Sequence, residues 1–412
     1  WGHHLQDAGV RVESIGKLHY RSEDDPTGLD RQHIPMHIKD GVGMIHTSVR
    51  KQFPDFSPPP PKPGGGAAGI VLEAGRGESE YPRYDRKVAE LACDWLLEQA
   101  DSDEPWVLFV SFVTPHYPLL APDEFFDLYS VDEMPMPKLG HQTDYAHHPW
   151  LADIMKVNLG ADGSTRVHKT AYAAYLGLCS FMDAMVGKVV NTLTDIGGLG
   201  RTRVIYASDH GENAGARGQW GKSNHYEEAS GIPMIIAGAG VPVGKISHTP
   251  VSLVDVHPSI INWTIAEDPD AGELPGRCLF EIAMAYDDPD RVAFSEYHAA
   301  KSPSGSFMIR KGRYKYIHYV GFEPELFDLE SDPEEEHDLS GDPLYVDVLR
   351  DYEAILRNMI DPEEIDRQAN AAQKEMVERA GGPEQVFANL VTTKSYTPVP
   401  DAIDAALRRE AE

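Results

Sequence analysis

An adjacent aspartate and histidine are the strongest local chemical signal in the sequence. Asp209 and His210 end the run VIYASDHG (204–211), in which an apolar segment typical of a buried strand leads to a glycine. A carboxylate and an imidazole at such a point can both bind a divalent metal ion. The alternative is a structural turn in which the aspartate caps a following helix. The pair alone leaves both interpretations open.

A lysine follows this pair after a short glycine-containing stretch. Lys222 lies in GQWGKS (218–223), thirteen residues beyond Asp209. Glycines let the backbone come close to a bound group, and a lysine there could neutralise an anionic oxygen. A solvated surface lysine is the alternative interpretation.

Two further segments place basic side chains directly after apolar runs. Lys17 and His19 belong to GKLHY (16–20), where an extended chain points both side chains to the same side. His116 belongs to TPHYP (114–118), a turn that its two prolines make rigid. These residues could bind an oxyanion and move a proton, or they could be ordinary polar residues of loops.

Short apolar runs alternate with helical patterns along the first part of the chain, which predicts an α/β fold. Its mostly parallel sheet should be sandwiched by helices on both faces. Because the candidate residues follow strands, and ligands collect at the carboxyl ends of strands, we expect them to meet at one rim of this sheet. We expect strands at 10–15, 106–113, 203–207 and 232–237, and helices at 85–100 and 170–196.

A different pattern begins near Asp290. Two short alternating segments within 307–319 flank Lys311-Gly312-Arg313, which predicts an antiparallel hairpin. We therefore divide the chain into an α/β domain, 1–289, and a small antiparallel C-terminal subdomain, 290–412, with a helix near 345–359. The Pro/Gly-rich run 57–66 is expected to be a surface loop. The charged tail after residue 362 is expected to be an arm that reaches another subunit.

The overall charge is strongly acidic. The 412 residues include 37 Lys and Arg against 66 Asp and Glu, a net charge of −29. Such a field repels nucleic acids and acidic membranes, so an anion site needs a local cluster of cations. It would favour a cationic group on a ligand. We find no run of about eighteen apolar residues, and we expect no membrane span.

The three cysteines give no sign of a disulfide framework or a zinc site. Cys93, Cys179 and Cys278 are odd in number, lie far apart and form no CxxC pair. A reducing cytoplasm is the expected location.

The motifs taken together, in this order, resemble the sulfatase branch of the alkaline phosphatase superfamily, which includes choline-sulfatase-like enzymes and phosphonate monoester hydrolases. GKLHY resembles the GKxH motif of the family, TPHYP its PHxP region, and SDHGENAGARGQWGKS (208–223) its metal-binding signature and subsequent lysine. The runs SEYH (295–298), IRKGRYKYI (309–317) and ELFDLESDPEEEHDL (325–339) are similar to its C-terminal region.

The resemblance implies a role for each candidate residue. Asp209 and His210 would bind one divalent ion, calcium or manganese. Lys17 and Lys222 would contact the oxygens of a sulfate or phosphate group. His19 and His116 would contact the substrate oxyanion or the leaving group, and one of them or Lys222 would protonate the leaving group.

One departure from the family pattern concerns the nucleophile, which in the family is a formylglycine made from Cys in a Cys-x-Pro/Ala-x-Arg context. Cys93 is followed by Asp-Trp-Leu, Cys179 by Ser-Phe-Met and Cys278 by Leu-Phe-Glu, and none of these fits. The family pattern also has an Asp pair before GKxH. We therefore expect that the chain is truncated at its start. The residues upstream of Trp1 should contain the Asp pair and, after it, a Cys- or Ser-based motif that is matured to the nucleophile.

The expected activity is metal-dependent hydrolysis of a small sulfate ester. In the family mechanism the hydrated aldehyde attacks sulfur and its second hydroxyl expels sulfate. The alternatives are a phosphonate monoester hydrolase or phosphodiesterase of the same fold, and a non-catalytic fragment that acts as a binding module. We expect a homo-oligomer that binds neither nucleic acid nor membrane.

Overall fold

The computed structural model describes residues 1–50, 67–139, 145–158, 164–265, 269, 272–299, 302–390 and 397–411. The loop predicted at 57–66 lies outside these residues.

A three-stranded parallel sheet carries the N-terminal candidate residues. β1 (Arg11–Lys17) lies between β2 (Arg31–Met36) and β4 (Trp106–Ser111), and both neighbours run parallel to it. Val12 and Ile15 of β1 are fully buried, as expected for a central strand with an apolar sequence. The prediction of a parallel sheet among helices is confirmed here.

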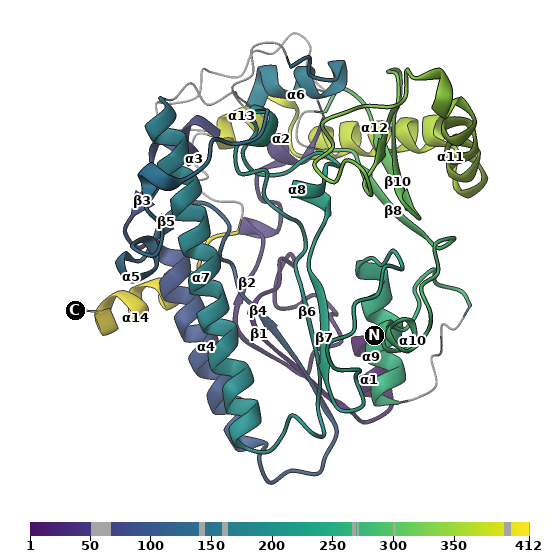
Figure 1. Ribbon diagram of the computed structural model, residues 1–412. Helices are drawn as coiled ribbons and strands as arrows, with labels where there is room; N and C mark the ends of the chain where they lie inside the picture. Colours follow the sequence, from purple (N-terminus) through teal and green to yellow (C-terminus); the bar gives the residue numbers. More distant parts are fainter. Residues whose placement is uncertain are drawn as a thin grey trace.

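A second pair of strands carries the Asp-His pair. β6 (Arg203–Ala207) pairs with β7 (Met234–Gly238) in antiparallel register, whereas the sequence suggested a largely parallel arrangement. Two antiparallel strands can be connected without a crossover helix. The connection from β6 to β7 contains only helices of one turn. Figure 1 shows β6 and β7 next to the β2-β1-β4 sheet.

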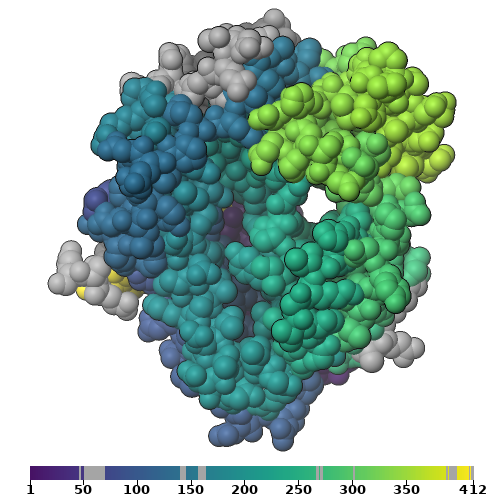
Figure 2. All heavy atoms as spheres, in the orientation of Figure 1, coloured from purple at the N-terminus to yellow at the C-terminus, as the bar shows by residue number. Residues whose placement is uncertain are grey.

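The apolar strands β4 and β6 are less buried than β1. All residues of β6 are only partly buried, and Phe109 of β4 is 43% exposed. Figure 2 shows a recess at the centre of the molecule in which the purple N-terminal segment is visible between teal residues. Within the described residues, β4 and β6 each have one strand neighbour only.

Two long helices cover one face of the sheet. α4 (Glu80–Glu98) and α7 (Thr165–Asp195) lie side by side to the left of the strands in Figure 1. Tyr84 and Val88 of α4 pack on Ile15 in the largest apolar cluster. Both helices begin within five residues of their predicted positions.

The helix α7 also meets the length and composition of a membrane span. Its 31 residues include a window with a mean hydropathy of 1.4, which differs from the expectation of no such segment. Ala171, Ala174 and Leu178 on this helix are completely buried against other parts of the chain. We therefore interpret α7 as a helix that packs within the α/β domain.

The C-terminal part forms a four-stranded antiparallel sheet in the order β11-β10-β9-β8, which confirms the predicted hairpin. Its strands are β8 (Val292–Tyr297), β9 (Ser306–Lys311), β10 (Tyr314–Tyr319) and β11 (Glu325–Asp328). The helix α11 (Val346–Met359) packs on this sheet through Tyr352 and Leu356. The division of the chain at residue 289 stays a prediction.

The tail after residue 362 is helical, and an arm that reaches another subunit stays a prediction. It contains α12 (Pro362–Arg379), α13 (Pro383–Leu390) and α14 (Asp401–Ala411). Val399 and Leu407 join the apolar cluster around α4, so the end of the tail packs on its own chain. The helical periodicity was missed because charged residues mask the narrow apolar stripe of each helix.

The remaining elements are short or peripheral. They are α1 (Gly2–Asp7), η1 (Lys39–Gly41), α2 (Ile45–Ser48), α3 (Ala67–Leu72), β3 (Gly75–Arg76), β5 (Leu120–Ala121), α5 (Asp123–Phe126), η2 (Val131–Glu133), α6 (Pro149–Asn158), η3 (Ala216–Gly218), α8 (Glu227–Ser230), η4 (Leu253–Asp255), α9 (Val256–Thr264), α10 (Leu279–Met284) and η5 (Pro343–Tyr345).

A buried arginine joins the loop after β6 to the segment that follows β11. The side chain of Arg217 is 1% exposed, and its guanidinium lies 3.9 Å from the ring centroid of Tyr226. It donates to Glu228 Oε2 at 3.1 Å and to the carbonyls of Glu334 and Glu335 at 3.0 and 2.8 Å. A desolvated cation with this many acceptors fixes the two parts of the chain against each other.

Arg217→Ala should therefore lower the free energy of unfolding by about 3–5 kcal/mol, because it leaves buried acceptors without a donor. The measurement is urea denaturation followed by circular dichroism. Arg350→Ala is the matched control, since the Arg350 side chain is 69% exposed beside Asp347; its effect should stay within about 1 kcal/mol. Equal effects of the two substitutions would contradict this interpretation.

Candidate active site

The ammonium group of Lys222 lies between two imidazoles at the carboxyl ends of the strands. Its Nζ is 2.7 Å from His210 Nε2 and 3.2 Å from His116 Nε2. The three residues come from two connections, one after β4 and one after β6. This contact brings together segments that are more than a hundred residues apart in the sequence.

Backbone carbonyls fix the two imidazoles in the same tautomer. His116 Nδ1 lies 2.9 Å from the carbonyl of Tyr117, and His210 Nδ1 lies 2.9 Å from the carbonyl of Gly211. A carbonyl can only accept, so each Nδ1 carries the proton and each Nε2 presents a lone pair. Both lone pairs face Lys222.

Asp209 lies beside this group and directly follows β6. Its Oδ2 is 3.6 Å from His210 Nε2, and its Oδ1 accepts a hydrogen bond from the backbone N–H of His210. Desolvation raises the pKa of the Asp209 carboxyl, whose side chain is 69% exposed, but the interactions with His210, Lys17 and Lys222 outweigh this effect and lower the pKa overall. Asp209 is therefore an anion at neutral pH.

Lys17 ends β1, and His19 follows it in a strained conformation. His19 has a φ of 63°, a value that side-chain-bearing residues rarely adopt. Its backbone N–H donates to the carbonyl of Met36 on β2, and its Nδ1 lies 3.0 Å from Thr397 Oγ1. The neighbouring strand and the C-terminal segment together determine where this imidazole points.

Burial and mutual repulsion of the basic groups keep the imidazoles neutral. Burial, then the charge of Lys222, lowers the pKa of His116 to about 3. Burial and the charges of Lys17 and Lys222 also lower the pKa of His19. Burial lowers the pKa of Lys222 to about 8, so this side chain is still mostly charged at pH 7.

The structure thus brings all six predicted residues into one region. Lys17 acts electrostatically on His19, His116, Asp209, His210 and Lys222. The individual roles of these residues stay predictions.

The donor atoms of Asp209 and His210 suit two neighbouring ligands of one ion. Ligands about 2.0–2.3 Å from an ion and at right angles to each other are about 3 Å apart, and Asp209 Oδ2 and His210 Nε2 are 3.6 Å apart. The Nδ1–H tautomer of His210 leaves the lone pair of Nε2 free for a metal. This lone pair can bind the ion or accept a hydrogen bond from Lys222, but not both at once. In the described part of the chain, no group of three or more His, Cys, Asp or Glu side chains could hold a metal.

None of the cysteines is placed to act as a nucleophile in this region. Cys179 lies within α7, and burial raises the pKa of its thiol to about 11, which disfavours the reactive thiolate. Cys278 is buried and its Sγ lies 3.8 Å from Asn262 Oδ1. Cys93 lies within α4.

Sequence reasoning missed the residues that set the position of Lys222. Glu212 Oε1 accepts from the backbone N–H groups of Ala214, at 3.1 Å, and Gly221, at 2.5 Å. The backbone and side-chain N–H groups of Asn213 both donate to the carbonyl of Gly221 at 2.7 Å. These bonds close the loop immediately before Lys222. The only sequence signal is a polar Glu-Asn pair after Gly211, which is common in loops.

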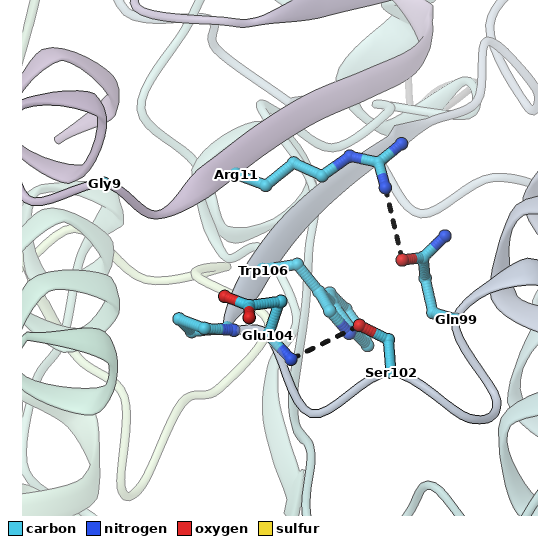
Figure 3. Close-up of a pocket in the computed structure, with 7 residues that line it drawn as sticks. Gly9, Arg11, Gln99, Ser102, Glu104 and Trp106 are labelled. Carbon is cyan, nitrogen blue, oxygen red and sulfur yellow. Dashed lines mark hydrogen bonds between the residues drawn. The ribbon is translucent and has the colours of Figure 1, made fainter.

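Two surface hollows lie apart from the contacts of Lys222. The first, of about 240 Å³, is at the amino ends of β1 and β4, and Figure 3 shows Arg11 and Trp106 in its wall. This is the opposite end of the strands from Lys17. The second, of about 460 Å³, is lined by Arg21, Asp25 and Ile38 after the carboxyl ends of β1 and β2.

Glu212→Ala should weaken sulfate binding about tenfold, because the loop before Lys222 loses two charge-assisted hydrogen bonds. Glu212→Gln keeps an acceptor oxygen and should lose less sulfate affinity than Glu212→Ala. Isothermal titration with sulfate at low ionic strength checks this. Glu104→Ala is the control, since Glu104 carries the same charge at the other end of the strands; unchanged affinity in Glu212→Ala would rule out this role for the loop closure.

The chain is similar to known proteins along most of its length. The sulfatase family model matches residues 2–266, and the model of the N-sulphoglucosamine sulphohydrolase C-terminal region matches residues 215–362. The chain is 31% identical to the choline-sulfatase of Rhizobium meliloti (strain 1021) over 83% of its own length and 67% of that protein. It is 28% identical to arylsulfatase K of Bos taurus over 81% of its length and 62% of that protein.

Solved structures share the fold. The phosphonate monoester hydrolase of Agrobacterium radiobacter superposes with a TM-score of 0.63 at 19% identity, covering 86% of this chain and 78% of that one. The family match spans more than half of the chain and includes the Asp-His pair and Lys222. The chain therefore belongs to the sulfatase family of the alkaline phosphatase superfamily.

Proposed function

We propose that this protein hydrolyses small sulfate esters, with Lys17, His19, His116 and Lys222 around the sulfate group and a divalent ion on Asp209 and His210. The observation that carries the proposal is that Lys222 lies within hydrogen-bond distance of His116 and His210, beside Asp209. A cation, the neutral imidazole of His116 and the Asp209-His210 pair, which would bind the ion, therefore lie in one group. These are the parts that binding a sulfate ester next to a metal requires.

The charge of the group supports binding of an anion. Lys222 and Lys17 supply positive charge in a chain whose net charge is −29, and both act on the pKa of Asp209. Lys222 is partly buried, and its reduced hydration strengthens its attraction for an oxyanion. The neutral His116 can hold or pass on a proton through Nε2.

The metal ion, calcium or manganese, would supply Lewis-acid polarisation of a sulfate oxygen. The imidazole ligand favours manganese, whereas a carboxylate suits either ion. Because the described residues offer only two such ligands, the proposal includes further ligands and a formylglycine nucleophile from outside the described residues. The partly buried apolar strands β4 and β6, with open edges, are where another strand could pair.

The test is an assay of the protein made from its natural coding region, with calcium or manganese. It should release nitrophenol from 4-nitrophenyl sulfate, and Lys222→Ala should reduce kcat/KM by about a hundredfold or more. Lys245→Ala, which removes an exposed lysine bonded only to the carbonyl of Ala285 among the described contacts, is the control. Preference for a phenyl phosphonate monoester over the sulfate would reassign the substrate class, and an unchanged rate in Lys222→Ala would overturn the assignment of the site.

Choline sulfate is the second substrate to assay. The acidic field of the chain favours a cationic alcohol, and the relative from Rhizobium meliloti is a choline-sulfatase. We expect kcat/KM for choline sulfate to fall with added salt more than that for 4-nitrophenyl sulfate. Equal salt dependence for both substrates would contradict a role for the protein charge in selecting the alcohol.

A further inference from the structure

A fully buried carboxylate on α4 holds the start of the turn that carries His116. Asp85 is 0% exposed. Its Oδ1 accepts from the backbone N–H of Val113 at 2.9 Å, and its Oδ2 accepts from the backbone N–H of Thr114 at 2.8 Å and from Thr114 Oγ1 at 2.6 Å. Three donors from two consecutive residues fix the chain where it leaves β4.

The preceding residue of α4 holds the other outer strand of the sheet. Tyr84 is fully buried, and its hydroxyl donates to the carbonyl of Ile34 on β2 at 2.6 Å. β2 and β4 flank β1, so two consecutive residues of one helix bind β2 and the segment that directly follows β4. The helix therefore sets the spacing of the chain segments that approach the site.

A carboxylate in this position is costly, which argues for more than simple packing. Burial raises the pKa of Asp85 to about 7, against the opposing effects of its hydrogen bonds to Thr114 and Val113 and of the charge of Lys17. A buried charge without partners costs several kcal/mol. A neutral side chain could satisfy one or two of the three donors, but only a carboxylate offers two acceptor oxygens without bringing a donor of its own.

We propose that Asp85 is a positioning residue for His116: it fixes residues 113 and 114 so that His116 Nε2 meets the ammonium group of Lys222. The path is short, since Thr114 is two residues from His116 and His116 Nε2 is 3.2 Å from Lys222 Nζ. Asp85 itself touches neither Lys222 nor His116 in the described contacts. Its effect on sulfate binding rests on the proposed function, whereas its effect on the place of His116 does not.

Two substitutions test this at the two ends of the same contact. Asp85→Asn replaces one acceptor oxygen by an N–H₂ group, which must face one of the backbone donors. Thr114→Val keeps the shape of the side chain and removes the hydroxyl, and Thr114→Ser restores it. Asp94→Asn is the control, because it makes the same change on the same helix at an exposed position.

The first readout is the histidine Cε1–H NMR spectrum, in which His116→Gln identifies the resonance of His116. We expect Asp85→Asn and Thr114→Val to shift this resonance, and Thr114→Ser and Asp94→Asn to leave it in place. The second readout is sulfate affinity by calorimetry. It should fall about tenfold in Asp85→Asn and about threefold in Thr114→Val, as expected for the loss of charge-assisted and single hydrogen bonds.

The results separate this proposal from the proposed function. If wild-type protein does not bind sulfate, the proposed function fails, and the resonance of His116 still tests Asp85. If Asp85→Asn and Thr114→Val have wild-type circular dichroism and an unshifted His116 resonance, the positioning role is overturned. Where Asp85→Asn does not fold, the comparison of Thr114→Val with Thr114→Ser decides by the same criterion.

Discussion

The contact between the Lys222 ammonium group and two imidazoles is the interaction on which the site depends. A partly desolvated lysine is stabilised when nearby groups accept its protons, and the two Nε2 lone pairs do so. That requires both imidazoles to carry their proton on Nδ1, which the carbonyls of Tyr117 and Gly211 impose. The direction of two backbone carbonyls therefore determines where a positive charge can lie.

Several parts of the fold serve to keep this contact in place. The loop that contains Lys222 is closed by Glu212 and Asn213, and its outer end is anchored by Arg217 to the carbonyls of Glu334 and Glu335. The position of Lys222 thus depends on a segment that is more than a hundred residues further along the chain. This segment follows the small antiparallel sheet, which supplies none of the six predicted site residues.

The sequence predicted the elements more readily than the contacts between them. Apolar strands such as 203–207 were located to the residue because apolar runs bounded by polar residues have few other interpretations. The antiparallel pairing of β6 with β7 was not predicted, because an apolar strand looks alike in both orientations. The contacts of Asp85 with Thr114 and of Thr397 with His19 join distant segments, and no local pattern in the sequence marks Asp85 or Thr397. Each of the six candidate residues lies within a short motif, whereas Asp85 and Thr397 lie outside these motifs.

The acidity of the chain and the basicity of this region act at different distances. At physiological salt the Debye length is about 8 Å, so most of the −29 charge is screened from a ligand already in contact with Lys222. Within that distance, the attraction of Lys222 for the ligand is stronger than the repulsion by the distant acidic residues, because the surroundings of Lys222 have a low dielectric constant. Farther from Lys222, the negative field of the chain slows the approach of a free anion and attracts the positive end of a zwitterion. A sulfate ester of a cationic alcohol avoids the long-range repulsion and still presents its sulfate to the lysines, and in this way one charge distribution can disfavour free sulfate and favour such an ester.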